Sequence, residues 1–304
     1  MVRNILGLLL FAALTSVPNI AVAQIRVVAS FSILGDIAEQ IGGTAVHVTP
    51  IVGPDQDAHI YSPSVADARA FAAADLVILN GLGFETWADR LIAGSGTRAP
   101  ILTVANDLAV VLHNEDEDAE TAHASDDVDP HAWGAIANGI VYAAAIREAF
   151  TALEPAESEL FQANFAAFER AALNAKASYQ ARISALPVDH RTIVTSHDAF
   201  GYFAEESGLT FLAPLGLNSA AAATASQVRD LITQLKALPH AALFVENIHN
   251  PALIQQIADE TGLQVSNITL YSDALSGPEG PASTYLDWYS HNMESVLAAL
   301  EENH

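Results

Sequence analysis

The chain alternates short apolar runs with amphipathic segments over most of its length. Val, Ile and Leu concentrate in four runs of the first half, which we interpret as buried strands: residues 25–29, 46–49, 76–79 and 101–104. Helix-like spacing of apolar residues occupies intervening segments, including 33–41 and 64–74. Strands that alternate with helices in this way are typical of a parallel sheet, so the first half is predicted to form an α/β lobe.

The alternation of strands and helices resumes at residue 191, after a long helical segment. Four further runs are interpreted as strands: residues 192–196, 210–213, 242–246 and 264–268. The segment between the two halves, 154–187, is rich in alanine and has no Gly or Pro between Pro155 and Pro187. About 30 helical residues at 1.5 Å each would form a rod of roughly 45 Å, longer than a crossover within one sheet requires. The pattern therefore predicts two α/β lobes connected by a linking helix.

The first 23 residues have the pattern of a secretory signal peptide. One basic residue, Arg3, precedes an apolar run over 5–14, and the small residues Ala21-Val22-Ala23 form a cleavage position before Gln24. A membrane anchor is the alternative, but this run is shorter than the about 20 residues that a bilayer span needs. We therefore expect cleavage after Ala23 and three further parts: an N-terminal lobe over 24–153, the linking helix over 154–187 and a C-terminal lobe over 188–304.

The charge balance narrows the classes of partner. The chain has 36 acidic and 12 basic residues, a net charge of −24, and no cysteine. Binding to nucleic acid needs clustered lysine and arginine, so nucleic acid is excluded as a partner. Without disulfides, stability has to come from a large core, for which a hydrophobic content of 51% suffices. A secreted chain without a lipid-accepting cysteine is expected to be soluble, and we infer a Gram-negative periplasm.

Four potential metal ligands lie just beyond predicted strands or at loop ends. His59 and His131 lie on loops that precede helical segments, whereas His197 and Asp273 follow predicted strands of the second half. In open parallel sheets, ligands bind in the crevice outside the carboxyl ends of the strands. Three imidazoles and one carboxylate are a donor set that suits tetrahedral zinc. For each residue taken alone, a solvated surface histidine or a capping aspartate is the alternative.

Four short motifs surround these positions or lie between them: residues 57–61 (DAHIY), 80–85 (NGLGFE), 129–133 (DPHAW) and 196–203 (SHDAFGYF). Together they resemble the metal-specific solute-binding proteins of ABC importers, in particular the zinc-uptake type. The resemblance implies an α/β fold of two Rossmann-like lobes with parallel sheets, joined by a long rigid backbone helix. A stiff connection limits domain rotation, so metal capture is expected to rely on the ordering of loops.

The residue at the third ligand position indicates which metal the resemblance favours. Manganese-type relatives carry a carboxylate there, whereas His197 resembles the zinc branch, and an imidazole in place of a hard oxygen disfavours manganese. The implied function is high-affinity capture of zinc in the periplasm and its delivery to an ABC transporter membrane permease. A periplasmic zinc chaperone is a further candidate partner, and we expect a monomer. A manganese-binding member of the same family is the alternative.

A zinc-dependent hydrolase is the alternative from a different class. Three protein ligands and an open water position on zinc are the arrangement of hydrolytic enzymes. The sequence has neither an H-E-x-x-H nor a G-x-S-x-G motif to accompany the histidines. A binding protein rather than an enzyme is therefore predicted. A metal-dependent adhesin is a third alternative, and it would need a surface anchor.

The acidic segment 113–129 is the most loop-like part of the N-terminal half. It contains eight acidic residues, two histidines and no basic residue. We interpret it either as a mobile lid that collects metal, since relatives carry a His- and acid-rich insertion at this place, or as a solvated linker. His113 and His123 are predicted to be weak auxiliary sites. His249 follows a predicted strand on the side of the main ligands and is a further candidate, whereas we expect five histidines to be bystanders: His47, His190, His240, His291 and His304.

Overall fold

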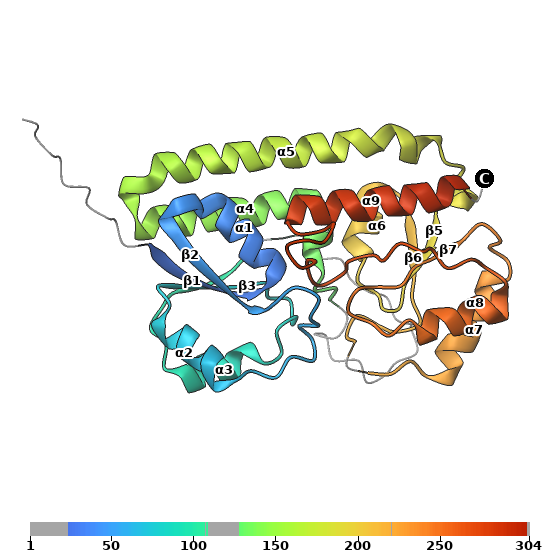
Figure 1. Cartoon of the computed structure of the whole chain (residues 1–304), viewed down its shortest axis with the longest axis horizontal. Helices are drawn as coiled ribbons and strands as arrows, with labels where there is room; N and C mark the ends of the chain where they lie inside the picture. The colour runs from blue at the N-terminus through green and yellow to red at the C-terminus, as the bar shows by residue number, and fades with distance from the viewer. Residues whose placement is uncertain (1–23, 107, 109–127, 220, 303–304) are drawn as a thin grey trace, which may run out of the picture.

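The computed structural model describes residues 24–106, 108, 128–219 and 221–302. Two α/β lobes lie side by side, and a long helix runs along both of them (Figure 1). Among the described residues, none of the helices is long and apolar enough to cross a membrane. The predicted signal peptide, 1–23, the histidines His113 and His123 of the acidic segment, and His304 lie outside the described residues.

The N-terminal lobe is built on a four-stranded parallel sheet with the order β2-β1-β3-β4. Its strands are β1 (Ile25–Phe31), β2 (Val46–Val52), β3 (Leu76–Leu79) and β4 (Ile101–Thr103). The connecting helices are α1 (Ser32–Gly42), the short 3-10 helix η1 (Gly43–Ala45), α2 (Val65–Ala73) and α3 (Ala88–Ser95). All of β3 is buried, because inner strands of a parallel sheet are covered on both faces. The four strands predicted for this half are confirmed.

The C-terminal lobe has a smaller parallel sheet with the order β6-β5-β7. Its elements are β5 (Thr192–Val194), α6 (Gly201–Ser207), β6 (Thr210–Leu212), α7 (Ala225–Leu235), β7 (Ala242–Leu243) and α8 (Ala252–Thr261). The fourth strand predicted over 264–268 is wrong. Val265 forms only a single bridge to Leu243, because the Ser266 hydroxyl accepts the backbone N–H of Ile268 and turns the chain.

Three long helices form a layer over both lobes (Figure 1): α4 (Ile136–Leu153), α5 (Ser158–Ala185) and α9 (Tyr285–Glu302). The 28 residues of α5 extend about 42 Å at 1.5 Å per residue. The helix begins later than predicted, because Pro155 opens the 3-10 helix η3 (Pro155–Glu157) instead. A further 3-10 helix, η4 (Val188–His190), follows it. The predicted fold of two parallel-sheet lobes joined by a long helix is confirmed, whereas the exact lobe boundaries stay a prediction.

The two lobes share buried side chains at their boundary. The Trp133 ring lies 4.9 Å from that of Phe31 in β1, measured between ring centroids. Its indole N–H donates to the backbone oxygen of Ser272 in the C-terminal half, at 3.2 Å. The Tyr285 hydroxyl at the start of α9 donates to the backbone oxygen of Trp133 at 2.7 Å. Trp133 therefore fixes the two lobes against each other next to His131 and Asp273.

Candidate metal centre

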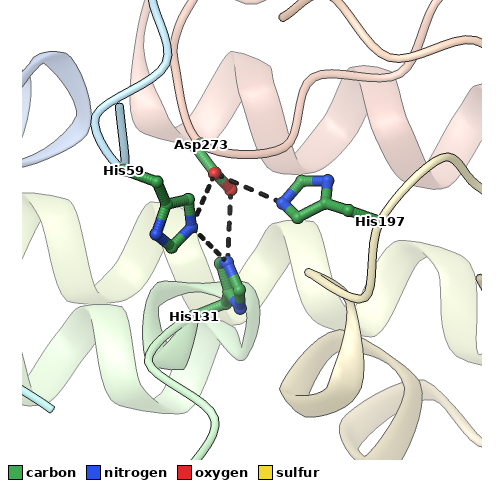
Figure 2. Close-up of side chains that lie close together, drawn as sticks. All are labelled: His59, His131, His197 and Asp273. Atoms are coloured by element: carbon green, nitrogen blue, oxygen red, sulfur yellow. Dashed lines mark hydrogen bonds and ion pairs between the residues drawn. The ribbon is translucent and has the colours of Figure 1, made fainter. Parts of the chain in front are cut away.

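The loops that carry the four predicted ligands meet between the two lobes. His59 lies between β2 and α2, and His131 lies directly before the 3-10 helix η2 (Ala132–Gly134). His197 lies between β5 and α6, and Asp273 lies between α8 and α9. Figure 2 shows the four side chains pointing toward one another from separate segments. The structure therefore brings together all four residues that the sequence singled out.

The candidate ligand atoms form a tight cluster. His59 Nε2 lies 3.2 Å from His131 Nε2 and 3.2 Å from Asp273 Oδ2. His197 Nε2 lies 3.3 Å from Asp273 Oδ2, and His131 Nε2 lies 3.6 Å from Asp273 Oδ1. All four residues are buried, with His59 the most exposed at 6%. One ligand atom from each residue lies within 4.8 Å of every other.

These separations match the edges of a small coordination tetrahedron. Zinc bonds of about 2.0–2.1 Å to nitrogen and oxygen imply a separation of roughly 3.3 Å between neighbouring ligand atoms. The four contacts between ligand atoms of the cluster run from 3.2 to 3.6 Å. The buried carboxylate oxygens of Asp273 face the Nε2 atoms of three imidazoles at 3.2 to 3.6 Å, which is the spacing of donor atoms around a shared cation. This donor set therefore fits a cation of zinc size.

A buried carboxylate orients His131. Asp129 Oδ1 accepts the backbone N–H of His131 at 2.8 Å and lies 2.7 Å from its Nδ1. With Nδ1 facing a carboxylate, Nε2 is left to face the cluster, which is how many metal-binding histidines are held. The motif over 80–85 supports the same loop, since the Asn80 side chain donates to the backbone oxygen of Pro130 at 2.8 Å. The Tyr142 hydroxyl in turn donates to Asn80 Oδ1 at 2.6 Å.

Glu246 has the equivalent position beside His197. Its Oε1 accepts the backbone N–H groups of Ser196 and His197, at 2.7 and 3.0 Å. Its Oε2 lies 2.7 Å from His197 Nδ1, and both side chains are buried. This role of Glu246 was not predicted from the sequence. The available signal was an acidic residue at the end of a predicted strand, but only the pairing of β5 with β7 brings it next to His197.

The loop of His59 is fixed by its own neighbours. Asp57 Oδ1 accepts the backbone N–H of His59 at 2.8 Å. The Trp87 indole N–H donates to the backbone oxygen of Ala58 at 3.0 Å. The Phe84 ring meets the His59 ring edge to face, with centroids 4.8 Å apart. Apolar rings and two short hydrogen bonds therefore set the direction of this imidazole.

The carboxylates and imidazoles of the cluster stabilise each other's charged forms. Burial alone would raise the pKa of Asp273, but the nearby imidazoles of His197 and His131 outweigh it and hold that pKa well below its ordinary value. Burial alone would lower the pKa of His197, yet the carboxylates of Glu246 and Asp273 raise it well above its ordinary value. A divalent cation would therefore displace a proton from His197, so binding is coupled to proton release.

Of the other histidines of the described chain, one adjoins the cluster, and the rest, including the exposed His47, lie outside it. His249 stacks on His197, with ring centroids 4.6 Å apart and planes 16° from parallel. The rings of His190 and His240 stack on each other with centroids 3.7 Å apart. They lie at the amino ends of β5 and β7, whereas His197 follows the carboxyl end of β5. His291 Nε2 donates to the backbone oxygen of Thr269 at 2.9 Å, and this histidine lies outside the cluster.

A two-lobed α/β protein with a buried nitrogen and oxygen cluster between its lobes has the architecture of a solute-binding protein for a metal cation. The family model described as zinc-uptake complex component A, periplasmic, matches residues 27–299. The chain belongs to this family.

Individual relatives cover nearly the whole chain. The manganese-binding lipoprotein MntA of Halalkalibacterium halodurans is 31% identical over 278 residues, which are 91% of this chain and 89% of that protein. The zinc-binding protein TroA of Treponema pallidum is 25% identical over 278 residues, 90% of this chain and 88% of that protein. A solved Mn-bound periplasmic metal binding protein from Candidatus Liberibacter asiaticus is 29% identical, with a TM-score of 0.80 over 91% of this chain and 100% of that chain.

Family membership establishes the general role of the protein. It is a metal-binding component of an ABC importer, and a membrane permease is the partner that such a component implies. The relatives are metal-binding transport proteins rather than enzymes, so the hydrolase alternative has no support at the family level. The names of the relatives include both manganese and zinc, so the choice of metal depends on the residues of this chain.

Proposed function

We propose that this protein captures zinc through His59, His131, His197 and Asp273 and delivers it to the permease of an ABC importer. The observation that carries the proposal is the geometry of the cluster: three imidazole nitrogens and one carboxylate with ligand atoms 3.2 to 3.6 Å apart. Zinc is the cargo in this account, so its release matters as much as its capture.

The nature of the donors supports zinc over manganese. Manganese favours oxygen ligands and six-fold coordination, whereas zinc accepts imidazole readily and is satisfied with four ligands. The third ligand position here is His197, and Glu246 at 2.7 Å aligns its ring toward the cluster. Manganese stays the second candidate metal, because the MntA relative is named for it.

We further propose a compartment, an oligomeric state and a second partner for the protein. The signal peptide over 1–23 would be cleaved after Ala23, which would leave a soluble periplasmic protein that carries zinc as a monomer. A periplasmic zinc chaperone would be an additional source of metal. The pattern of basic, apolar and small residues in that segment supports the cleavage, although the segment lies outside the described residues.

Competitive titration against a chromophoric chelator tests the metal assignment. The apoprotein should bind one equivalent of zinc, and far more tightly than manganese. His197→Ala should weaken zinc binding by more than the roughly 10- to 100-fold that loss of a supporting hydrogen-bond partner costs. His240→Ala is the matched control, because His240 is also a stacked histidine but lies at the amino end of the strands, away from the cluster. Equal zinc affinity in His197→Ala and His240→Ala would refute the proposed ligand set.

A further inference from the structure

A second group of potential ligands adjoins the four-residue cluster. Single donor atoms of His197, Glu246 and His249 lie within 4.8 Å of one another. Only His197 belongs to the proposed zinc centre. Glu246 and His249 both come from the segment that follows β7, so one loop supplies the two additional donors.

The candidate donor atoms of these two residues are buried beside His197. Glu246 is 1% exposed, and its Oε2 lies 2.7 Å from His197 Nδ1. A carboxylate oxygen has two lone pairs, so Oε2 can keep this contact and still offer one lone pair to a cation. His249 Nδ1 is buried and without a hydrogen-bond partner in the described part of the chain. A carboxylate oxygen and an imidazole nitrogen are donors that zinc accepts.

The position of His249 distinguishes it from the three histidines of the cluster. His59, His131 and His197 are buried, whereas His249 is partly exposed. Its ring lies nearly parallel to that of His197 with centroids 4.6 Å apart, and it is the more exposed of the two. Burial and the His197 ring lower the pKa of His249 and outweigh the carboxylates of Glu246, Asp273 and Asp57, which act to raise it. A cation that approaches from this side meets His249 before His197.

We propose that Glu246 Oε2 and His249 Nδ1 form a transfer position, through which zinc passes between solvent and the four-residue centre. The inference rests on the proposed function, since it concerns the path of the same cargo. Two protein donors hold zinc more weakly than four, so the ion would occupy this position in passing and complete its shell with water. His197 adjoins both positions, so the ion would not have to lose all protein ligands at once.

A transfer position has a kinetic signature that a packing role lacks. A group that contacts the cation only during passage lowers the barrier equally in both directions. Its removal therefore slows association and dissociation by the same factor and leaves the dissociation constant unchanged. A ring that only packs on His197 would instead affect the stability of the bound state, and so the dissociation constant. The two roles are thus separable by measuring both rates and the equilibrium.

His249→Phe is the informative variant, because phenylalanine keeps a flat ring against His197 but has no nitrogen donor. His240→Phe is the matched control, because His240 lies at the amino end of β7 and His249 lies beyond its carboxyl end. Association of zinc with the apoprotein would be followed by stopped-flow tryptophan fluorescence, since Trp133 lies 5.3 Å from the His131 ring between centroids. Dissociation would be followed by transfer of zinc to an excess of chelator.

The expected result for His249→Phe is a fall in both rate constants of about tenfold, equivalent to about 1.4 kcal/mol added to the barrier. The dissociation constant should stay within about threefold of wild type, and His240→Phe should match wild type in all three quantities. Unchanged rates in His249→Phe, or faster dissociation with weaker binding, would overturn the transfer position. The proposed function would stand in that case, provided that the wild-type protein binds zinc tightly. Absence of zinc binding by the wild-type protein would overturn both.

Discussion

Asp129 offers a direct test of how the protein controls its zinc affinity without touching the metal. The carboxylate is 2% exposed and contacts His131 twice, at the backbone N–H and at Nδ1, over 2.8 and 2.7 Å. Asp129→Asn keeps the size of the side chain and one oxygen acceptor but removes the negative charge. When zinc occupies Nε2, the proton of His131 lies on Nδ1, so the charged partner is most valuable in the bound state.

The magnitude follows from the kind of hydrogen bond that is lost. A hydrogen bond to a charged group contributes about 1.5–3 kcal/mol, and a neutral one about 0.5–1.5 kcal/mol. The substitution should therefore cost about 1.4 kcal/mol of binding free energy, or about a tenfold weaker dissociation constant. Competitive zinc titration at pH 7.5 measures it, with a thermal melt of the apoprotein to establish folding.

Asp75→Asn serves as the control for loss of one negative charge, because Asp75 pairs with Arg26 on the surface at 2.6 Å. It should leave zinc affinity within about twofold, since exposed charges act weakly over distance. A folded Asp129→Asn protein with wild-type affinity would refute the reasoning. In that case the orientation of His131 would have to come from packing against the rings of Trp133 and Phe84.

Three further predictions concern selectivity, stability and the rate of uptake. His197→Glu should shift the relative affinity from zinc toward manganese, because a hard oxygen replaces a nitrogen donor; unchanged relative affinities by competition would show that cavity shape decides. Burial raises the pKa of Asp36 to about 6, so its contribution to stability is present below pH 4 and is lost as pH rises through 6. Asp36→Asn has no carboxyl group to titrate, so its free energy of unfolding should rise by about 3 kcal/mol relative to that of wild type between pH 4 and 7.5. Denaturant unfolding measures this difference, and a difference that does not change with pH would contradict the prediction. Deletion of 114–127 should leave zinc affinity within about tenfold of wild type but slow the association of zinc at low salt, because acidic residues raise the local cation concentration. Equal association rates for wild type and the deletion variant at low and high salt would show that this segment is only a solvated linker.

The sequence identified the candidate ligands because their position is a consequence of topology. Parallel strands present their carboxyl ends at one edge, so residues that follow separate strands can be expected to meet there. His59 after β2 and His197 after β5 follow this rule directly. The local motifs added the resemblance to a family, and the family match over residues 27–299 supports it.

The residues that orient the ligands could not be found in the same way. Glu246 and His197 are far apart in the sequence, and they meet only because β7 is the neighbour of β5 in the sheet. Strand order is not encoded in the apolar pattern of either strand. The predicted strand over 264–268 failed for a related reason, since its composition allowed pairing but the Ser266 side chain competes for the backbone N–H of Ile268.

X-ray diffraction from zinc-loaded crystals, with anomalous data at the zinc edge, tests the central claim most directly. The account predicts one strong peak per chain between the two lobes, bonded to Nε2 of His59, His131 and His197 and to the Asp273 carboxylate at about 2.0–2.2 Å. No anomalous peak at this cluster, or zinc bound only elsewhere on the chain, would contradict it.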